Sequence, residues 1–358
     1  MRKLIHILIS GYLIAVFAIW PVYAGTCVAS KNGCWADVTV WGTSCNGVSN
    51  AVPVAGDDVQ LAGYIVTAIG NVTTDCTGSP SVTIPATGSL GTVTSAGTAG
   101  QISYDLSDAA CHGDETCTFT ATTVTGGTAP ATFGMIYTTG AAAADHILGI
   151  HANIVGGSAA TARGVYHNST GGVHITGTVT GGTGTGAENV TTGTMTITGN
   201  ITGAANTAVK NFAAGAVDIV GHVKGGTSAS AYGLNNNSTG AVTISNGAEG
   251  SSAAHSYGVY TASTGAIAIT GDITGGAGSD AAGIDNYGGA TVTLTTSNLI
   301  NGAGGVAFSG KPPVWTAGTT YYLKWYSGAG PLAAPDHYFW ESDSATYPTA
   351  GGGGAWGF

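Results

Sequence analysis

The sequence predicts an all-β protein that folds as a single-stranded parallel β-helix, a β-solenoid of about ten coils that we expect to be right-handed. Apolar and polar residues alternate over short stretches such as 266–276, which is the period of a strand. Similar stretches recur every 22 to 25 residues, as expected if each repeat is one coil. Glycine accounts for 61 of 358 residues and the repeated apolar positions are mostly β-branched, so helix is disfavoured.

Alignment of the repeats places apolar residues in four columns, which stacked coils would bury like on like about 4.8 Å apart. The first column holds Leu148, Val173, Met195, Val217, Val242, Ile267 and Val292. The second holds Ile150, Ile175, Ile197, Ile219, Ile244, Ile269 and Leu294. The third holds Ile154, Val179, Ile201, Val223, Ala248 and Ile273, and the fourth Val165, Val190, Val209, Leu234, Val259 and Ile284. Glycines two residues before the first column are predicted at tight corners: Gly171, Gly193, Gly215, Gly240 and Gly265.

Residues 1–24 are predicted to be a signal peptide. Arg2 and Lys3 precede an apolar run from Leu4 to Trp20, and Val22-x-Ala24 is a small-x-small cleavage site. The alternative is an uncleaved membrane anchor, because the run is long for a signal peptide; no second spanning run follows. Cleavage would change the net charge from −10 to −12, which makes nucleic acid and anionic membrane surfaces poor partners.

Residues 25–58 are predicted to form an N-terminal cap over the first coil. Trp35 and Trp41 are followed by Pro53-Val54-Ala55-Gly56-Asp57, an order that resembles the opening segment of many bacterial β-helix proteins. Over roughly residues 50–310 the repeats are similar to the coils of bacterial secreted and cell-surface β-helix proteins of the adhesin type. That resemblance implies the architecture; adhesins, lyases and ice-binding proteins share such coils.

The solenoid is expected over residues 59–310, with irregular, disulfide-stapled coils to about residue 145 and regular coils after it. The six cysteines all lie in the first third of the chain, and their even number in an exported protein favours disulfides of unknown pairing: Cys27, Cys34, Cys45, Cys76, Cys111 and Cys117. No Cys-x2-Cys pair is present, so no metal site is predicted among them.

Residues 311–358 are predicted to be an aromatic C-terminal cap and tail. Five aromatic residues of this segment are candidate contacts for a glycan or a partner chain: Trp315, Tyr321, Trp325, Tyr338 and Trp340. The competing interpretation is that they pack over the last coil, because aromatic side chains bury the most area per residue.

No catalytic site, cofactor site or metal site is predicted. Arg163 is the one arginine after residue 24, and the acids of the regular coils are expected in different columns: Glu188, Asp218, Glu249, Asp272, Asp280 and Asp285. Asp57 and Asp58 would point to opposite faces, and Asp105 and Asp108 suit a turn. His151 and His174 are expected to be diagonal neighbours, both as outward polar residues of a strand.

An ice-binding face is the sharpest alternative for this wall of the solenoid. The outward positions of the first strand read His174/Thr176, Thr196/Thr198, Asp218/Val220, Thr243/Ser245, Ala268/Thr270 and Thr293/Thr295. Stacked Thr-x-Thr resembles the surface of some β-solenoid antifreeze proteins, although threonine is also common on any exposed strand. His174, Asp218 and Ala268 interrupt the array.

These observations favour an exported, non-catalytic β-solenoid that acts as a structural or adhesion-type protein outside the cell, at its surface or in the periplasm. A glycan or a cell-surface or matrix component is the expected partner. An ice-binding protein and a polysaccharide-binding or polysaccharide-degrading β-helix are the alternatives.

We predict that the exported protein has no free thiol, because all six cysteines fall in one region of a secreted chain. Thiol counting on denatured, non-reduced protein should give a value near zero. Two or more free thiols would instead favour a metal-binding or reactive cysteine.

Overall fold

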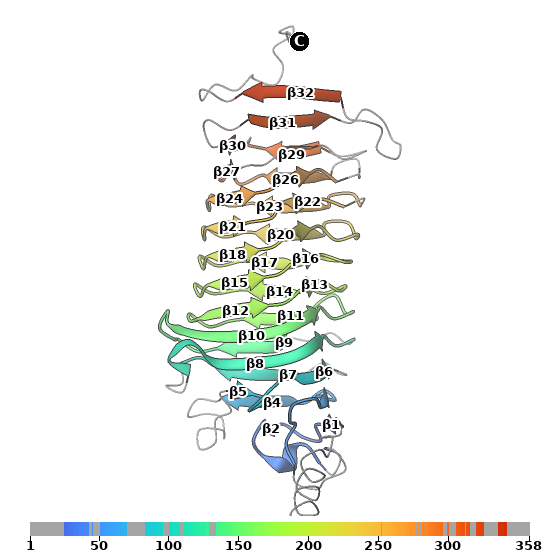
Figure 1. The fold of residues 1–358 in the computed structure, drawn as a ribbon, viewed down its shortest axis with the longest axis vertical. Coiled ribbons are helices and arrows are strands. Elements are labelled where there is room, and N and C mark those ends of the chain that lie inside the picture. Colours follow the sequence, from blue (N-terminus) through green and yellow to red (C-terminus); the bar gives the residue numbers. More distant parts are fainter. Residues whose placement is uncertain are drawn as a thin grey trace, which may run out of the picture.

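The computed structural model describes a rod of stacked strands, in which the chain climbs from β1 to β32 along the long axis (Figure 1). The described residues are 25–42, 45, 51–69, 83–95, 100–107, 111–128, 134–251, 253–276, 278, 281–295, 299–300, 306–311, 313–315, 320–325 and 336–341. Strands dominate this part of the chain, and its only helix is one 3-10 turn, η1 (Val38–Val40). The predicted signal peptide and Cys76, Asp108 and Asp280 lie outside it.

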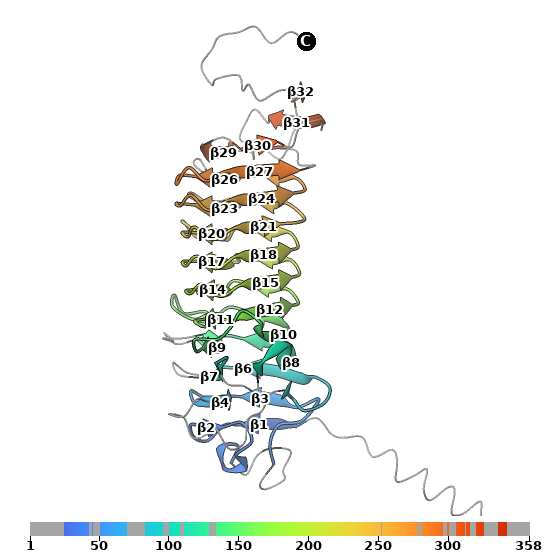
Figure 2. The same ribbon diagram turned by 90° about the vertical axis from the view of Figure 1, so that its left-hand side faces the viewer.

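Each regular coil contributes two short strands to a 21-stranded sheet and one strand to an 11-stranded sheet, and the two sheets run side by side up the rod (Figure 2). The paired strands of the larger sheet are β12 (Gly172–Thr176) and β13 (Val179–Thr180), β15 (Met195–Thr198) and β16 (Ile201–Thr202), β18 (Val217–Val220) and β19 (Val223–Lys224), β21 (Val242–Ile244) and β22 (Ala248–Glu249), β24 (Ile267–Thr270) and β25 (Ile273–Thr274), and β27 (Val292–Thr295) and β28 (Leu299–Ile300). The smaller sheet receives β14 (Ala187–Asn189), β17 (Val209–Asn211), β20 (Tyr232–Asn236), β23 (Tyr257–Thr261), β26 (Ala282–Asn286) and β29 (Val306–Gly310). The predicted parallel β-helix is therefore confirmed.

The coils before residue 172 are less regular, with strands that range from two to 13 residues in length. In the larger sheet these are β1 (Thr26–Val28), β3 (Asp58–Gln60), β5 (Thr83–Ile84), β6 (Leu90–Thr94), β8 (Gly113–Thr125) and β10 (His146–Val155). In the smaller sheet they are β2 (Gly33–Cys34), β4 (Ile65–Ile69), β7 (Gln101–Asp105), β9 (Gly134–Thr139) and β11 (Arg163–His167). Because β1 pairs with β3 and β2 with β4, the first described residues already run in register with the coil that follows.

The last strands depart from the parallel pattern. β30 (Val314–Trp315) and β31 (Thr320–Trp325) still pair in parallel with β27 and β28, whereas β32 (Asp336–Glu341) turns back antiparallel on β31. No helix in the described ranges is both long and apolar enough to cross a membrane.

The predicted core columns are confirmed in their register with one exception. Leu148 through Val292 and Ile150 through Leu294 pair coil by coil in the first two columns, and their side chains are buried. In the fourth column Ala187, not Val190, pairs between Val165 and Val209. The prediction of Val190 was wrong because it favoured a branched apolar residue over the correct spacing; Ala187 is fully buried and Val190 is partly exposed.

The corner glycines are required by close approach of stacked backbones. A Cβ on Gly193 would collide with the carbonyl oxygen of Gly171, and one on Gly215 with that of Gly193. The same contact recurs between Gly240 and Gly215. The tight packing predicted at these corners is therefore what excludes larger side chains.

A buried polar ladder holds each corner in place. It comprises Thr138, His167, Asn189, Asn211, Asn236, Thr261 and Asn286, which stack in register between the fourth column and the corner. The side-chain amides of Asn189 and Asn211 each donate to the carbonyl four residues on, at 2.9 Å, so the corner carbonyl stays satisfied without water. His167 does the same through Nε2, 3.0 Å from the oxygen of Gly171, while its Nδ1 lies 2.6 Å from the Thr138 hydroxyl.

The cysteines form disulfides at the irregular end of the rod. Cys27 is bonded to Cys45 and Cys111 to Cys117, and Cys34 is also disulfide-bonded. Nearby, the rings of Trp35 and Trp41 pack edge to face at 4.8 Å. The Asp57 carboxylate is buried and accepts hydrogen bonds from the backbone of Gly25 and Val54, so it organises the backbone of the first coil.

We expect Ile269→Lys to destabilise the rod by at least about 3 kcal/mol, because Ile269 is buried between Ile244 and Leu294 and a lysine there would be an unpaired charge. Thr270→Lys should change the free energy of unfolding by less than about 0.5 kcal/mol, because Thr270 is exposed. Urea unfolding of both variants tests the register, and equal losses would contradict it.

We also expect His167 to make the fold acid-sensitive. Burial lowers the pKa of His167 from 6.5 to about 4, so the unfolded chain binds more protons between these values. The stabilisation, up to about 3 kcal/mol, is complete above pH 6.5 and is lost as the pH falls towards 4. His167→Asn supplies the amide used elsewhere in the ladder and should flatten this part of the stability–pH curve. An unchanged slope in the variant would show that other groups cause it.

Candidate functional site

The outer face of the 11-stranded sheet groups aromatic and charged side chains from successive coils. Its central column lies one residue after the buried fourth column, on the opposite side of each strand. In register it reads Tyr137, Tyr166, Glu188, Lys210, Asn235, Tyr260, Asp285 and Ser309. We refer to these eight residues as the outer column.

Three tyrosines form a stacked cluster over β20 and β23, which we call the tyrosine cluster: Tyr232, Tyr257 and Tyr260. The ring of Tyr232 lies 5.3 Å from that of Tyr257 and 4.8 Å from that of Tyr260, and all three planes are within 15° of parallel. Because the rings stack on one another, the cluster offers mainly edges and hydroxyl groups to a ligand. Burial raises the pKa of Tyr232 and of Tyr260, so both hydroxyls remain protonated donors at neutral pH.

Asp285 adjoins the tyrosine cluster one coil further on. Its pKa is raised by burial, an effect opposed by hydrogen bonds from Ser309 and from the hydroxyl of Tyr257. Tyr287, on the same coil, is 80% exposed. Hydroxyl donors, a carboxylate acceptor and an exposed ring are thereby grouped at one end of the outer column.

A charged cluster occupies the other end of the column. Arg163 Nε lies 2.5 Å from Glu188 Oε2, and a second guanidinium nitrogen lies 3.3 Å from Oε1. The guanidinium carbon is 4.8 Å from the centre of the Tyr166 ring, which stacks on Tyr137 at 5.9 Å. Burial lowers the pKa of Lys210, which follows Glu188 in the column, and the Glu188 charge opposes that shift.

Asn235 lies between the two clusters and has an unused acceptor. Its register partners are Lys210 and Tyr260, and its side chain is only 8% exposed. The Oδ1 atom is buried and has no hydrogen-bond partner among the described residues. The Oδ1 atoms of the ladder residues Asn211 and Asn286 are likewise buried without a partner among the described residues, so Asn235 is distinguished by its place in the outer column.

The structure corrects the expectation that the acids fall in different columns. Glu188 and Asp285 share the outer column, four coils apart, and Arg163 and Lys210 gather around Glu188. The misplaced Val190 removed only Glu188 from this face, because Lys210, Asn235, Tyr260 and Asp285 follow fourth-column residues that were predicted correctly. With Ala187 in its place, the outer column is readable as the residue after each fourth-column position.

The predicted aromatic contacts lie on the terminal strands. The backbone register places Trp315 next to Leu294, Tyr321 opposite Trp340, and Trp325 opposite Asp336; Tyr338 faces Leu323. Their side chains lie outside the described part of the structure, so the choice between a cap and a binding patch stays a prediction.

The expected arrangement of His151 and His174 is confirmed, with an unforeseen carboxylate between them. His151 pairs with Thr176, and Glu115 reaches both imidazoles, 3.5 Å from His151 Nε2 and 3.0 Å from His174 Nδ1. Gly149 leaves room for the Glu115 side chain, which lies within 3.2 Å of where a Cβ would be.

The wall proposed for ice binding keeps its predicted register. His174, Thr196, Asp218, Thr243, Ala268 and Thr293 stack in one outward column. Asp218 accepts a hydrogen bond from the hydroxyl of Thr243, and Val220 is 43% exposed beside it. The threonine array is therefore interrupted by a charge and by an apolar side chain.

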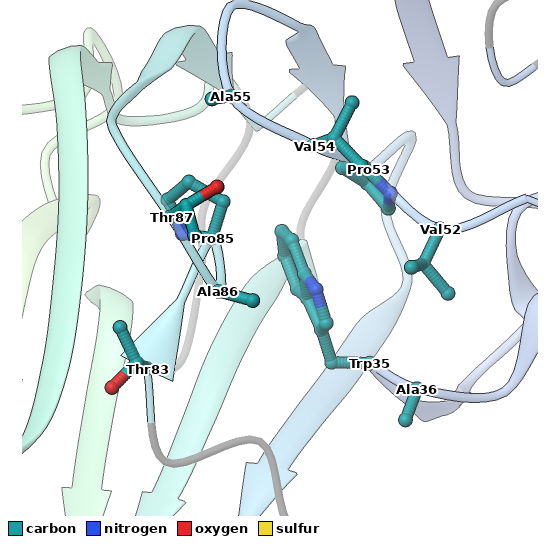
Figure 3. A pocket seen from close by; sticks show the side chains of 10 residues that line it. All are labelled: Trp35, Ala36, Val52, Pro53, Val54, Ala55, Thr83, Pro85, Ala86 and Thr87. Carbon is teal, nitrogen blue, oxygen red and sulfur yellow. The ribbon is translucent and has the colours of Figure 1, made fainter.

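A pocket of about 360 Å³ lies at the irregular end of the rod (Figure 3). The Trp35 ring lies between the segments 52–55 and 83–87, which line the pocket with it. Thr83 and Thr87 are its only polar lining residues apart from the tryptophan, and none is charged. With so few polar groups to orient a ligand, it is a weaker candidate than the outer column.

A scan against protein-family models, a search of curated proteins and a search of solved structures each found no match to this chain. Functional inference therefore depends on the geometry of the outer column.

Proposed function

We propose that this chain is an exported, non-catalytic β-solenoid of the adhesion type that binds a neutral glycan along the outer column. The observation that carries the proposal is the outer column itself, in which the register stacks the tyrosine cluster and Asp285 on one side of Asn235 and Arg163, Glu188 and Lys210 on the other. Sugar hydroxyl groups both donate and accept, so they match an amide oxygen, tyrosine hydroxyls and a carboxylate on one strip. Tyrosine and arginine are also the residue types that dominate binding energy at interfaces.

The charge balance selects among glycans. The net charge of −10, or −12 after cleavage of residues 1–24, repels acidic polymers. A neutral polysaccharide avoids this repulsion, and a rod with eleven described strands in one sheet, about 4.8 Å apart, offers it a face roughly 50 Å long.

The carboxylates of the strip favour binding over cleavage. Glu188 and Asp285 are separated by four coils, or about 19 Å, whereas paired glycosidase carboxylates lie roughly 5–10 Å apart. Both oxygens of Glu188 accept from Arg163, which occupies the acceptor sites that a catalytic base would need. Glycan binding without cleavage is therefore favoured over polysaccharide degradation.

Ice binding is the other alternative, and it would use the outward threonine column of the 21-stranded sheet. Interruption of its threonine column by Asp218 and Ala268 argues against it, because an ice-binding surface needs a regular array. An ice-recrystallisation assay on the intact protein separates the two: activity abolished by Thr198→Tyr and retained in Tyr260→Ala would favour ice.

We expect Tyr260→Ala and Asn235→Ala to weaken glycan binding at least about 10-fold while leaving the fold intact. Neutral glycans on an array, followed by calorimetry with the best binder, supply the measurement. Asn237→Ala is the matched control, because Asn237 is an exposed amide two residues away. Equal binding by all three variants would contradict the assignment of the face, and release of shorter sugars by the wild-type protein would contradict the non-catalytic proposal.

A further inference from the structure

Two segments meet at the start of the long strands β8 and β10. His112 directly precedes β8, and Asp145 directly precedes His146, the first residue of β10. The amide of Gly113 donates to the carbonyl of Asp145 at 3.1 Å, and Gly113 pairs with His146 in the ladder. The Cys111–Cys117 disulfide closes the short loop that carries His112, so the backbone on both sides is fixed.

The side chains of these segments bring three metal-ligand atoms together. His112 Nε2 lies 3.2 Å from Asp145 Oδ2, and one ligand atom from each of His112, Asp145 and His146 lies within 4.8 Å of the others. Two ligands bound to one tetrahedral cation at 2.0–2.1 Å are about 3.3 Å apart. His112 and Asp145 could therefore hold a cation with almost no change in their separation.

His146 makes the second hydrogen bond that a metal-ligating histidine usually has. Its Nδ1 lies 2.5 Å from the carbonyl oxygen of Leu106, and because a carbonyl only accepts, Nδ1 must carry the proton. The lone pair is thereby left on Nε2. Ligating histidines usually donate their other nitrogen to a carbonyl or carboxylate in this way, which fixes tautomer and ring orientation. His146 is buried, and its ring lies 5.1 Å from that of His112 at 74°.

We propose that His112, Asp145 and His146 form a binding site for a divalent d-block cation, with Zn²⁺ as the best-matched ion. Two imidazoles and a carboxylate are ligands that suit zinc, and a solvent molecule would complete the coordination. The side chains of His112 and Asp145 are 68% and 54% exposed, which gives the ion a path from solvent. The ion would tie the disulfide-closed loop 111–117 to the start of β10, a function separate from glycan binding.

The neighbouring group of Glu115, His151 and His174 is the competing location. There each imidazole approaches a different oxygen of one carboxylate, so the Glu115 carboxylate is already shared between the two rings. Both groups of side chains lie at the irregular end of the rod, so the experiment has to distinguish a cation bound at His112, Asp145 and His146 from one bound at Glu115, His151 and His174.

Calorimetric titration of the metal-free exported protein with zinc chloride tests the site. We expect one ion per chain, with binding weakened at least about 10-fold by His112→Ala and by Asp145→Asn. His222→Ala is the matched control, because His222 is a half-buried histidine of a regular coil far along the chain, and its affinity should equal that of the wild type. Zinc should also raise the melting temperature of the wild type and of His222→Ala, and raise it less in the two site variants.

Unchanged affinity in both site variants would overturn the proposal. So would loss of binding in Glu115→Gln with full binding retained in Asp145→Asn, since that places the ion in the neighbouring group. Because His112 and Asp145 are exposed, their variants should melt like the wild type in the absence of metal, so a loss of affinity is not a loss of fold.

Discussion

The whole molecule depends on the in-register stacking of parallel strands from one coil to the next. Each coil contributes only a few apolar residues and cannot bury them alone, so every inward position has to match the coil above and below. This explains why Ile175, Ile197 and Ile219 lie directly over one another, all nearly fully buried. It also explains the corners. There the backbone of each corner glycine packs against the carbonyl group of the corner glycine in the preceding coil. An asparagine side-chain amide in turn donates a hydrogen bond to the corner carbonyl.

The same stacking also aligns the outward-facing side chains of successive coils. A residue that follows the buried fourth column appears once per coil on the outer face, so a chain with few charges can still group them. Glu188 and Lys210 occupy equivalent positions on successive coils, and Arg163 reaches Glu188 from the preceding coil, three residues before the outer-column residue Tyr166. The tyrosine cluster arises in the same way from two coils, and Asn235 joins the two groups. A linear face of this kind suits a linear ligand, which is why a glycan is the partner we propose.

At the irregular end of the rod, the strands do not all pair in continuous register. The strands β8 and β10 are 13 and 10 residues long, and their pairing shifts register twice. Where the register shifts, side chains from different positions in the coil converge rather than stack like on like. Glu115 reaches His151 and His174 from such a place, and His112, Asp145 and His146 meet at the start of the same strand pair. The most varied chemistry of the described residues therefore lies where the repeat is least regular.

The sequence alone determined the fold class, the direction of nearly every core side chain and the spacing of the coils, because a period of two within a period of 22 to 25 residues has one simple packing solution. It also predicted the disulfides that the described cysteines form, from the even number of cysteines gathered in one third of the chain. It did not determine which residue fills the fourth column between Val165 and Val209: Val190 is the bulkier apolar candidate, and the strand register places Ala187 there, and Glu188 outside it. Nor did it determine the histidine and carboxylate groups, because contacts such as that between His174 and Glu115, 59 residues apart, exist only through the stacking of one particular irregular coil on the next.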